Sequence, residues 1–401
     1  MDFTLSPAAE KTRSEFRTWL RHNLPDFDRW KRMRDDGQTP ERIDFLKRWQ
    51  GRLNEARWVA VHWPATYGGR DGSLLEHLAV HQELVRAAAP PLINGPSISI
   101  FGPTLLVYGR PDQKQRYLPK LLSAEEVWCL GFSEPNAGSD LASLRTRAER
   151  DGDAWVLNGQ KVWTTYANRA DYCMFLVRTD PHAPPHKGIS CVVVPLCTPG
   201  VTVRPLREIT GDTDFNEVFL DNVRIPADTV VGDVNKGWEV ILTALGHERG
   251  TLLLVDHMRR QDDMTRLRAL IRSRARGEDP VARQQFAQCH IEVEIMGLHC
   301  FKVMSDLEQG RPQNDVSILK LYGSELVQRL DDFALTLQGP YAQLWRGAPH
   351  VMDEGEWQFK WLMARAMTIA SGTSEVQRNI IAQRMLGLPR GQGSGVVEKR
   401  S

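Results

Sequence analysis

The sequence predicts a mainly α-helical protein with a β-domain in its middle. Long segments with apolar residues at helical spacing occupy both ends of the chain, whereas residues 125–233 contain short β-rich runs separated by Pro and Gly. At 401 residues the chain exceeds one average domain. We therefore expect an N-terminal helical domain over 1–124, a middle β-domain over 125–233, a C-terminal helical bundle over 234–390 and a flexible tail over 391–401.

The first region carries clear helix signals. Ser6 followed by Pro7 is typical of an N-cap and first-turn pair, and Pro25 should end the apolar repeat that follows. Further helices are expected from Pro40 to Ala56 and from Leu74 to Ala88.

The middle region has the period and punctuation of β-structure. Asn158-Gly159 lies between two β-rich runs, 155–157 and 161–163, and this dipeptide favours a two-residue hairpin turn. Further strands are expected at 172–178, 189–196, 201–206 and 216–223, the last closed by Pro226.

The third region turns helical again. The segments 237–258, 281–309 and 317–337 each carry apolar residues at helical spacing over lengths typical of a bundle. A last helix should begin near Ser374.

Composition and charge point away from several classes of protein. The formal net charge of +1 gives no reason to expect nucleic acid as a partner. No stretch approaches the roughly 18 apolar residues of a membrane helix, and the N-terminus shows no export signal. Six cysteines without a CxxC pair suggest free thiols in a reducing cytoplasm, so we expect a cytoplasmic protein without membrane insertion. No metal is expected, because the sequence lacks HExxH and Cys/His clusters.

Two segments of the middle region are suited to a flat, polar, aromatic ligand. Their sequences are FSEPNAGSD at 132–140 and NGQKVWTT at 158–165. Their small residues allow backbone amides to approach a ligand, and their hydroxyl side chains can meet the polar edge of a ring. The indole of Trp163 offers a face for stacking.

This pair of segments resembles the flavin-embracing signature of the acyl-CoA dehydrogenase family. A second family signature, GTSEVQRNI, lies at 372–380, and the resemblance extends from about the first helix to Leu388. It implies an N-terminal helical domain, a middle β-barrel-like domain and a C-terminal four-helix bundle, with bound FAD. It also implies that a base removes the proton from Cα of an acyl thioester while flavin N5 takes a hydride from Cβ.

The residue that serves as base in many family members is replaced here. That glutamate precedes the Gly-Thr of the second signature, where this chain has Ser371. A subset of the family carries its glutamate on the first long helix of the C-terminal domain, before an arginine, and Glu248-Arg249 matches that position. We interpret Glu248 as the base and Arg249 as a residue that shapes the substrate pocket. The alternative is an ordinary Glu–Arg pair on a solvated helix face.

The resemblance also implies roles for residues of the two flavin segments. Phe132 and Ser133 match residues at the pyrimidine edge of the flavin, and Ser139 matches one near the flavin phosphates and the pantetheine arm of the substrate. Trp163 matches the indole against the isoalloxazine, and Thr165 matches the hydroxyl near N5.

Further roles are implied for the C-terminal region. Ser371, with its backbone N–H toward the thioester oxygen, and Gly372 are expected at the substrate, and Thr373 and Glu375 match cofactor-side positions. Arg283 matches an arginine that reaches the FAD pyrophosphate of a neighbouring subunit. Gln338 and Gly339 resemble the turn beside the adenine half of FAD. An oligomer is therefore implied: a homotetramer, a homodimer or a heterotetramer with a related subunit.

The acyl group is less well defined by the sequence. The combination of Glu248 before an arginine and Ser371 before the second signature resembles bacterial members that act on branched, long-chain or steroid side-chain acyl-CoA. An electron-transfer flavoprotein is the implied electron acceptor, and a carrier-protein thioester stays an alternative to acyl-CoA. Two other functions stay open, namely a flavin-dependent oxidase or monooxygenase and a non-catalytic partner subunit.

Overall fold

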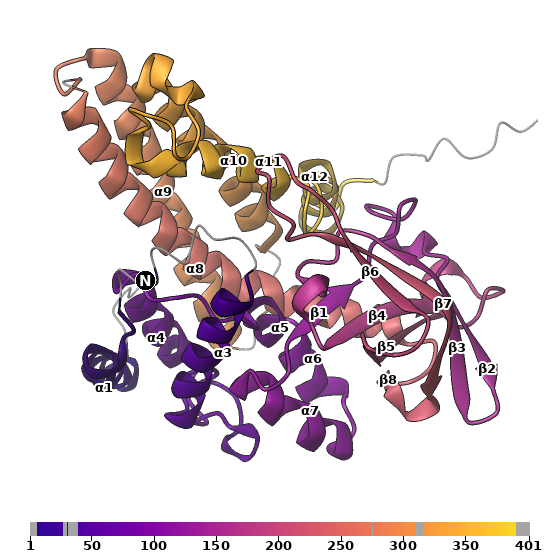
Figure 1. The fold of residues 1–401 in the computed structure, drawn as a ribbon. Coiled ribbons are helices and arrows are strands. Elements are labelled where there is room, and N and C mark those ends of the chain that lie inside the picture. Colours follow the sequence, from indigo (N-terminus) through magenta and orange to yellow (C-terminus); the bar gives the residue numbers. More distant parts are fainter. Residues whose placement is uncertain are drawn as a thin grey trace, which may run out of the picture. The chain divides into compact units, whose positions relative to one another are not determined.

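The computed structural model describes residues 6–26, 30, 39–274, 276–309, 311 and 316–389, with the side chains of 245–254 and 307–308 excepted. The predicted tail 391–401 lies outside the described residues. The chain divides into two compact units, Met1–Arg259 and Arg260–Ser401. The division falls inside helix α8 (Gly237–Ser273), which is labelled in Figure 1. The three predicted domain boundaries stay a prediction.

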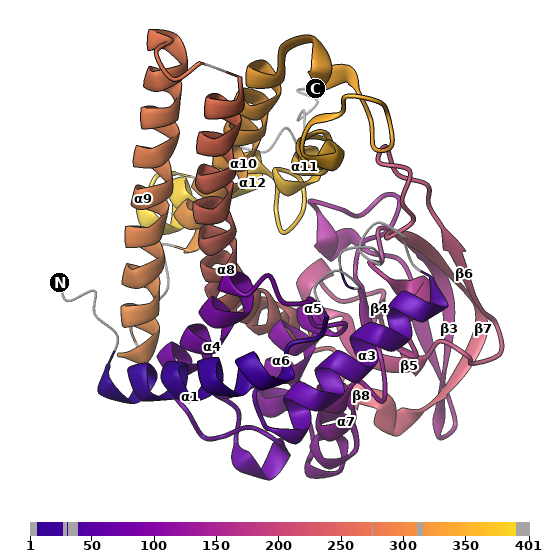
Figure 2. The same cartoon turned by 60° about the vertical axis from the view of Figure 1, so that its left-hand side comes forward.

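The first unit begins with helices whose ends follow local rules. Ser6 caps the first helix, because its side chain accepts a hydrogen bond from Ala9 N, and Pro25 lies just beyond the helix end, as predicted. Helix α1 packs against α4 (Figure 2). The helices are α1 (Pro7–Asn23), α3 (Pro40–Glu55), α4 (Leu74–Arg86), α5 (Gly95–Ser99), α6 (Phe101–Tyr108) and α7 (Pro111–Ser123).

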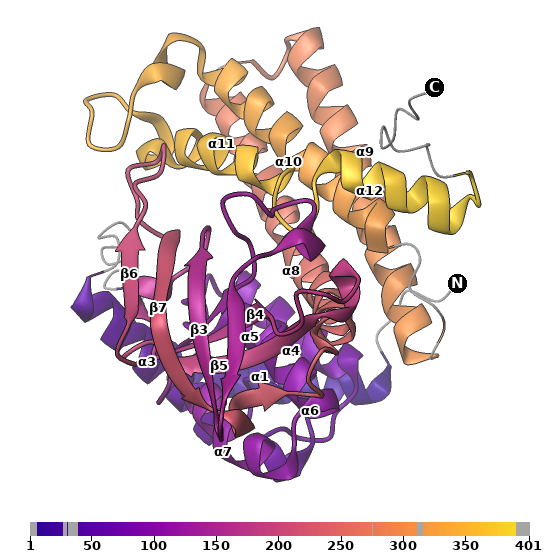
Figure 3. The ribbon, with the colours of Figure 1, turned by 90° about the vertical axis from the view of Figure 1, so that its right-hand side faces the viewer.

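The β-strands of the first unit form one sheet in the order β6-β7-β3-β2-β4-β5-β8, with β1 paired to β4 in parallel. Figure 3 shows β6, β7 and β3 side by side. The strands are β1 (Trp128–Gly131), β2 (Arg147–Asp151), β3 (Ala154–Lys161), β4 (Tyr172–Arg178), β5 (Ile189–Pro195), β6 (Val201–Pro205), β7 (Asn216–Pro226) and β8 (Val230–Val231).

Strand β4 is buried on both faces. Met174 and Leu176 belong to the core that contains the helical residues Phe101 and Leu105, whereas Phe175 and its alternating neighbours belong to a second core on the other face. Since successive side chains of a strand point to opposite faces, one strand joins both cores. Strand β4 therefore connects the core that the sheet shares with the helices to the core on the other face of the sheet.

The predicted hairpin at Asn158-Gly159 is wrong. Both residues lie inside the continuous strand β3, which pairs with β2 and β7, and a register shift between Leu157 and Gly159 marks a β-bulge. Asn158 Oδ1 accepts a hydrogen bond from Asn222 N, 2.9 Å away on β7. The turn between β2 and β3 lies instead at Gly152, whose φ is +61°. Position 159 needs a glycine for space, because a Cβ there would lie 2.5 Å from Thr146 Oγ1.

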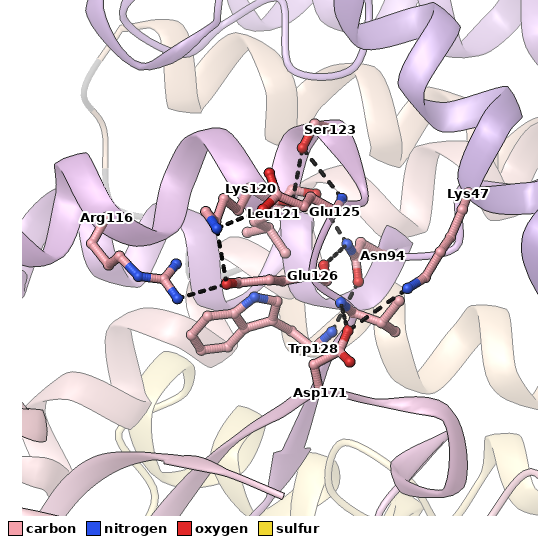
Figure 4. A network of polar contacts seen from close by, with 11 residues as sticks. Lys47, Asn94, Arg116, Lys120, Leu121, Ser123, Glu125, Glu126, Trp128 and Asp171 are labelled. Carbon is pink, nitrogen blue, oxygen red and sulfur yellow. Dashed lines mark hydrogen bonds and ion pairs between the residues drawn. The ribbon is translucent and has the colours of Figure 1, made fainter. Parts of the chain in front are cut away.

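A polar network fixes the start of β1 against the helices (Figure 4). The Asn94 side chain donates to Leu121 O and Glu126 O at 3.0 and 2.7 Å and accepts from Trp128 N at 3.0 Å. The guanidinium of Arg116 binds the Glu126 carboxylate at 2.7 Å. These bonds join the end of α7 to β1, the strand that leads to the first flavin segment (132–140).

The remaining helices confirm the predicted helical third region. They are α8 (Gly237–Ser273), α9 (Pro280–Glu308), α10 (Val316–Gln338), α11 (Glu356–Met367) and α12 (Ser374–Ile380). Helix α10 packs against both α9 and α11. Helix α8 continues beyond its predicted end at Met258 to Ser273, and α11 occupies a segment for which no helix was predicted. The predicted fold class, mainly α with a central β-domain, is confirmed.

Candidate active site

The first flavin segment is a short loop that begins at the end of β1. Within it, Glu134 and Ala137 exchange two backbone hydrogen bonds of 3.1 Å, which close a tight turn. Ser133 O accepts from Val162 N at 3.0 Å, so the loop lies along the end of β3. The two segments that the sequence predicted to share a ligand therefore lie side by side.

A buried ion pair lies beneath this loop. Lys161 is fully buried and Glu134 is 9% exposed, and Lys161 Nζ lies 2.8 Å from Glu134 Oε1. Lys161 also donates to Phe132 O at 3.0 Å. The carboxylate accepts two backbone N–H groups as well, from Arg145 at 2.7 Å and from Thr146 at 2.8 Å. The pair thus has the additional hydrogen bonds that a buried charge requires.

Both members of the pair are ionised near neutral pH. Burial lowers the pKa of Lys161 to about 8, against the attraction of Glu134. Burial by itself raises the pKa of Glu134, but the Lys161 ammonium and the N–H donors outweigh it and hold that pKa below its usual value.

The second flavin segment ends in a turn with unusual backbone angles. Trp163 and Tyr166 have φ values of +58° and +62°, a left-handed conformation that bulky residues rarely adopt. Asn216 maintains the turn, since its backbone O accepts from Thr164 N and its Nδ2 donates to Thr164 O, both at 3.0 Å. Tyr166 N donates to Asp214 O at 2.6 Å. This backbone is constrained at several points.

The constrained turn presents an aromatic face to solvent. Trp163 is 61% exposed, and the ring of Phe215 meets it edge-on at 6.0 Å. The hydroxyls of Ser133, Ser139 and Thr165 make no hydrogen bond to the described part of the chain. An exposed indole and hydroxyls that have no partner among the described residues suit a flat ring with polar edges, which is the chemistry of a flavin. These four predicted positions are therefore compatible with FAD.

Helix α8 carries the predicted base. Its first turns are anchored in the hydrophobic core through Val240, Ile241 and Ala244, and Thr243 Oγ1 lies 3.0 Å from Tyr108 Oη of α6. The helix continues through position 248. The side chains of Glu248 and Arg249 lie outside the described residues.

The second unit contains the predicted Ser371 and Gly372 in a turn before α12. Their φ values are +54° and +91°. Gln377 Nε2 donates to Ser371 O at 2.9 Å, and the buried Lys320 donates from Nζ to Gly372 O at 2.6 Å. The turn is therefore set by α10 and α12 together, with the carbonyls of both residues bound on the protein side.

Three further residues of this unit that were predicted to bind the cofactor differ in their surroundings. Thr373 is the N-cap of α12, and its side chain accepts from Val376 N at 3.2 Å. Backbone and Thr373 hydrogen bonds lower the pKa of Glu375. The Arg283 side chain is exposed on the first turn of α9.

Gln338 and Gly339 lie at the end of α10. Gln338 is fully buried and accepts from Gln358 Nε2 at 2.8 Å, so its side chain points into the helical bundle. Gly339 has a φ of +60° and open space where a Cβ would stand. Of the two, Gly339 leaves room for a ligand.

Sequence reasoning missed three lysine and glutamate side chains that shape these segments. Glu134 and Lys161 were treated only as letters of the motif, and Lys320 was not considered. A signal for Lys161 was present, because it has the same parity along β3 as the buried Trp155 and Leu157. A lysine on the inward side of a strand indicates a buried partner.

Metal clusters and membrane-spanning helices are both absent from the part of the chain that the structure describes. Among them, no group of three or more His, Cys, Asp or Glu side chains is arranged to hold a metal ion. Within the same residues, no helix combines the length and the apolar character needed to cross a membrane.

Comparison with protein families accounts for nearly the whole chain. The model described as acyl-CoA dehydrogenase, N-terminal domain, matches residues 6–125. The corresponding middle-domain and C-terminal-domain models match residues 129–223 and 235–386.

Individual relatives are similar over their full lengths. Acyl-CoA dehydrogenase IpdE1 of Mycolicibacterium smegmatis is 38% identical over 395 residues, covering 95% of this chain and 98% of that protein. The solved structure of the Tcur3481-Tcur3483 steroid ACAD is similar with a TM-score of 0.87 and 32% identity, covering 98% of this chain and 100% of that chain. The solved structure of the ChsE4-ChsE5 complex from Mycobacterium tuberculosis is similar with a TM-score of 0.82 and 30% identity, covering 98% of this chain and 100% of that chain.

Proposed function

Because the chain belongs to the acyl-CoA dehydrogenase family, we propose that it catalyses the FAD-dependent α,β-dehydrogenation of an acyl-CoA thioester to the trans-2-enoyl-CoA. The observation that carries this proposal is the exposed indole of Trp163 on a constrained, left-handed turn. Backbone strain of this kind costs of the order of 1–3 kcal/mol and persists where the surrounding structure fixes it, often at ligand sites.

Five residues of the first unit would hold the flavin. The face of Trp163 would stack on the ring system, and Phe132, Ser133 and Thr165 would meet its polar edge. Ser139 would contact the phosphates and the pantetheine arm of the substrate. When bound, FAD supplies the acceptor for the hydride that leaves Cβ.

Glu248 is proposed as the base that takes the proton from Cα. The resemblance, in which a glutamate before an arginine on this helix serves as base, carries this proposal, and the helix continues through position 248. The family's other base position is occupied by Ser371, which has no comparable basicity. Arg249 is proposed to shape the pocket around this carboxylate.

Proposed roles also fall on residues of the second unit. The backbone N–H of Ser371, beside Gly372, would polarise the thioester oxygen and so stabilise the negative charge that develops there. Thr373, Glu375 and the Gln338-Gly339 turn are proposed on the cofactor side. Arg283 has the exposure needed to reach the FAD pyrophosphate of a neighbouring subunit.

The relatives favour a bulky substrate and a multisubunit assembly. One similar solved structure is named a steroid ACAD, and another is a complex of two different chains. We therefore propose a steroid side-chain or similarly bulky acyl-CoA as substrate, an electron-transfer flavoprotein as electron acceptor, and a heteromeric or homomeric oligomer in which this chain carries the base.

The test is an anaerobic titration of the purified protein with straight-chain, branched and steroid side-chain acyl-CoA thioesters, followed by flavin absorbance. We expect bleaching with wild type, and a reaction about 10²- to 10⁴-fold slower with Glu248→Gln, because the amide keeps the shape but accepts no proton. Glu239→Gln, at the exposed start of the same helix, is the matched control and should react like wild type.

Three other results would contradict a part of the proposal. Equal bleaching in wild type and Glu248→Gln would remove Glu248 as the base. A flavin-loaded wild type that stays oxidised with every thioester would instead favour the non-catalytic subunit. Fast reoxidation of the reduced flavin by oxygen would favour an oxidase.

A further inference from the structure

The buried pair Lys161–Glu134 does more than satisfy its own charges. Lys161 Nζ contacts both the Glu134 carboxylate, at 2.8 Å, and the carbonyl of Phe132, at 3.0 Å. Phe132 is the first residue of one proposed flavin segment, and Lys161 is two residues before Trp163 in the other. The Lys161 ammonium therefore connects the two segments on their buried side.

The carboxylate extends the bridge to a third segment. Through Arg145 N and Thr146 N, Glu134 binds the chain just before β2. Neither Lys161 nor Glu134 reaches the solvent-exposed side where Trp163 lies, since Lys161 is fully buried and Glu134 nearly so. The pair is thus placed to set the geometry of the ligand-facing backbone without touching the ligand.

We infer that Lys161, together with Glu134, is a positioning pair for the cofactor: it holds the Phe132–Ser133 backbone in register with the turn that presents Trp163 and Thr165. This inference rests on the proposed function, because it takes FAD as the ligand of the two segments. A lysine serves here because an ammonium can donate to a carboxylate and a carbonyl at once. Loss of the bridge should weaken FAD binding even where the fold is retained.

The experiment separates positioning from stability with a charge-neutral double variant. Lys161→Met alone leaves a buried carboxylate without its cation, and it should lower both the unfolding temperature of the apoprotein and the affinity for FAD. Adding Glu134→Gln removes the uncompensated charge, so Lys161→Met/Glu134→Gln should recover most of the unfolding temperature. It should still bind FAD about tenfold or more weakly, because the ammonium donor to Phe132 O is still missing.

The matched control is Lys187→Met, the same change at an exposed lysine in the loop before β5, which should leave FAD affinity unchanged. FAD affinity is measured by fluorescence titration of each apoprotein. A double variant that is stable and binds FAD as tightly as wild type would overturn the inference. A wild type that binds no FAD would instead overturn the proposed function.

A second measurement needs no unstable variant. The groups that face Lys161 are Glu134, Cys173 and Arg178. The pKa of Lys161 is lowered to about 8, so its charge is present below that pH and lost above it. The FAD dissociation constant of wild type should therefore rise several-fold from about pH 7 to about pH 9, and Lys161→Arg should abolish this rise. The same rise in Lys161→Arg would contradict the inference.

Discussion

Two buried carboxylates in this molecule have opposite surroundings. Glu134, in the first unit, accepts hydrogen bonds from one ammonium and two backbone N–H groups. Asp331, on α10 in the second unit, is fully buried, and neither carboxylate oxygen has a hydrogen-bond partner in the described part of the chain. The charge of the Glu134 carboxylate therefore has hydrogen-bond donors, whereas the Asp331 carboxylate has none among the described residues.

The pKa values of the two groups follow this difference. That of Glu134 stays below its usual value, whereas burial, and then the charge of Asp263, raise the pKa of Asp331 to about 7. Arg260 and Lys360 oppose this rise, but both bind Asp263, at 3.1 and 2.5 Å. A buried carboxylate is thus stabilised by donors aimed at it, and cations engaged elsewhere do not replace them.

The largest effect is expected from breaking the satisfied site. Glu134→Ala leaves Lys161 as a buried, unpaired cation and removes the acceptor of two backbone N–H groups. We expect a loss of about 3–5 kcal/mol in the free energy of unfolding near neutral pH, measured by denaturant titration. Glu149→Ala, at an exposed position on β2, is the control and should change stability by less than about 0.5 kcal/mol. A loss for Glu134→Ala as small as that of the control would show that the buried bonds contribute little.

The contribution of Asp331 to the free energy of unfolding should decrease as the pH rises. The folded-state pKa of Asp331 is raised from 3.8 to about 7, so folding is favoured while the group binds its proton, and that contribution is lost as pH rises toward about 7. The difference corresponds to roughly 4 kcal/mol at most.

Asp331→Asn should remove this loss, because the amide carries no charge at any pH. Its free energy of unfolding should match wild type near pH 4 and exceed it by about 1–4 kcal/mol near pH 8. Asp262→Asn, at an exposed position on α8, controls for the change in net charge. A gap between Asp331→Asn and wild type that stays constant across this pH range would show that Asp331 is not the titrating group.

The smallest expected effect on stability concerns the strained turn at Trp163. Trp163→Gly permits a φ of +58° without strain, so the apoprotein should gain up to about 1 kcal/mol in unfolding free energy. The same change removes the proposed stacking face and should weaken FAD binding about tenfold or more. Trp163→Phe keeps an aromatic face and should recover part of the affinity. If Trp163→Gly binds FAD as tightly as wild type, Trp163 is not a flavin contact.

Local features of the fold were predictable because their causes lie within a few residues. Ser6 and Thr373 both cap helices by accepting from an N–H three residues later, a bond that the sequence alone can specify. The predicted strands at 172–178, 189–196, 201–206 and 216–223 and the helical periods of the third region were likewise confirmed. Both depend on side-chain spacing along a single segment.

Features that depend on distant partners were not predictable. Asn158-Gly159 has the composition of a turn, yet pairing with β2 and β7 on either side makes it part of a strand. Lys320 fixes the Gly372 carbonyl across more than fifty residues of sequence. In such cases the free energy comes from bonds that exist only once the elements have been brought together.

The sequence by itself determined the family, the starts of several helices, four of the strands and the positions proposed to face a flavin. Only the tertiary structure decided that Lys161 is buried against Glu134, that Trp163 is exposed in a left-handed turn, and that Asp331 is buried without a donor among the described residues. The physical reason is that motifs and periodicity record local chemistry. Burial and charge compensation are instead set by which distant backbone and side-chain groups the fold brings within hydrogen-bond distance.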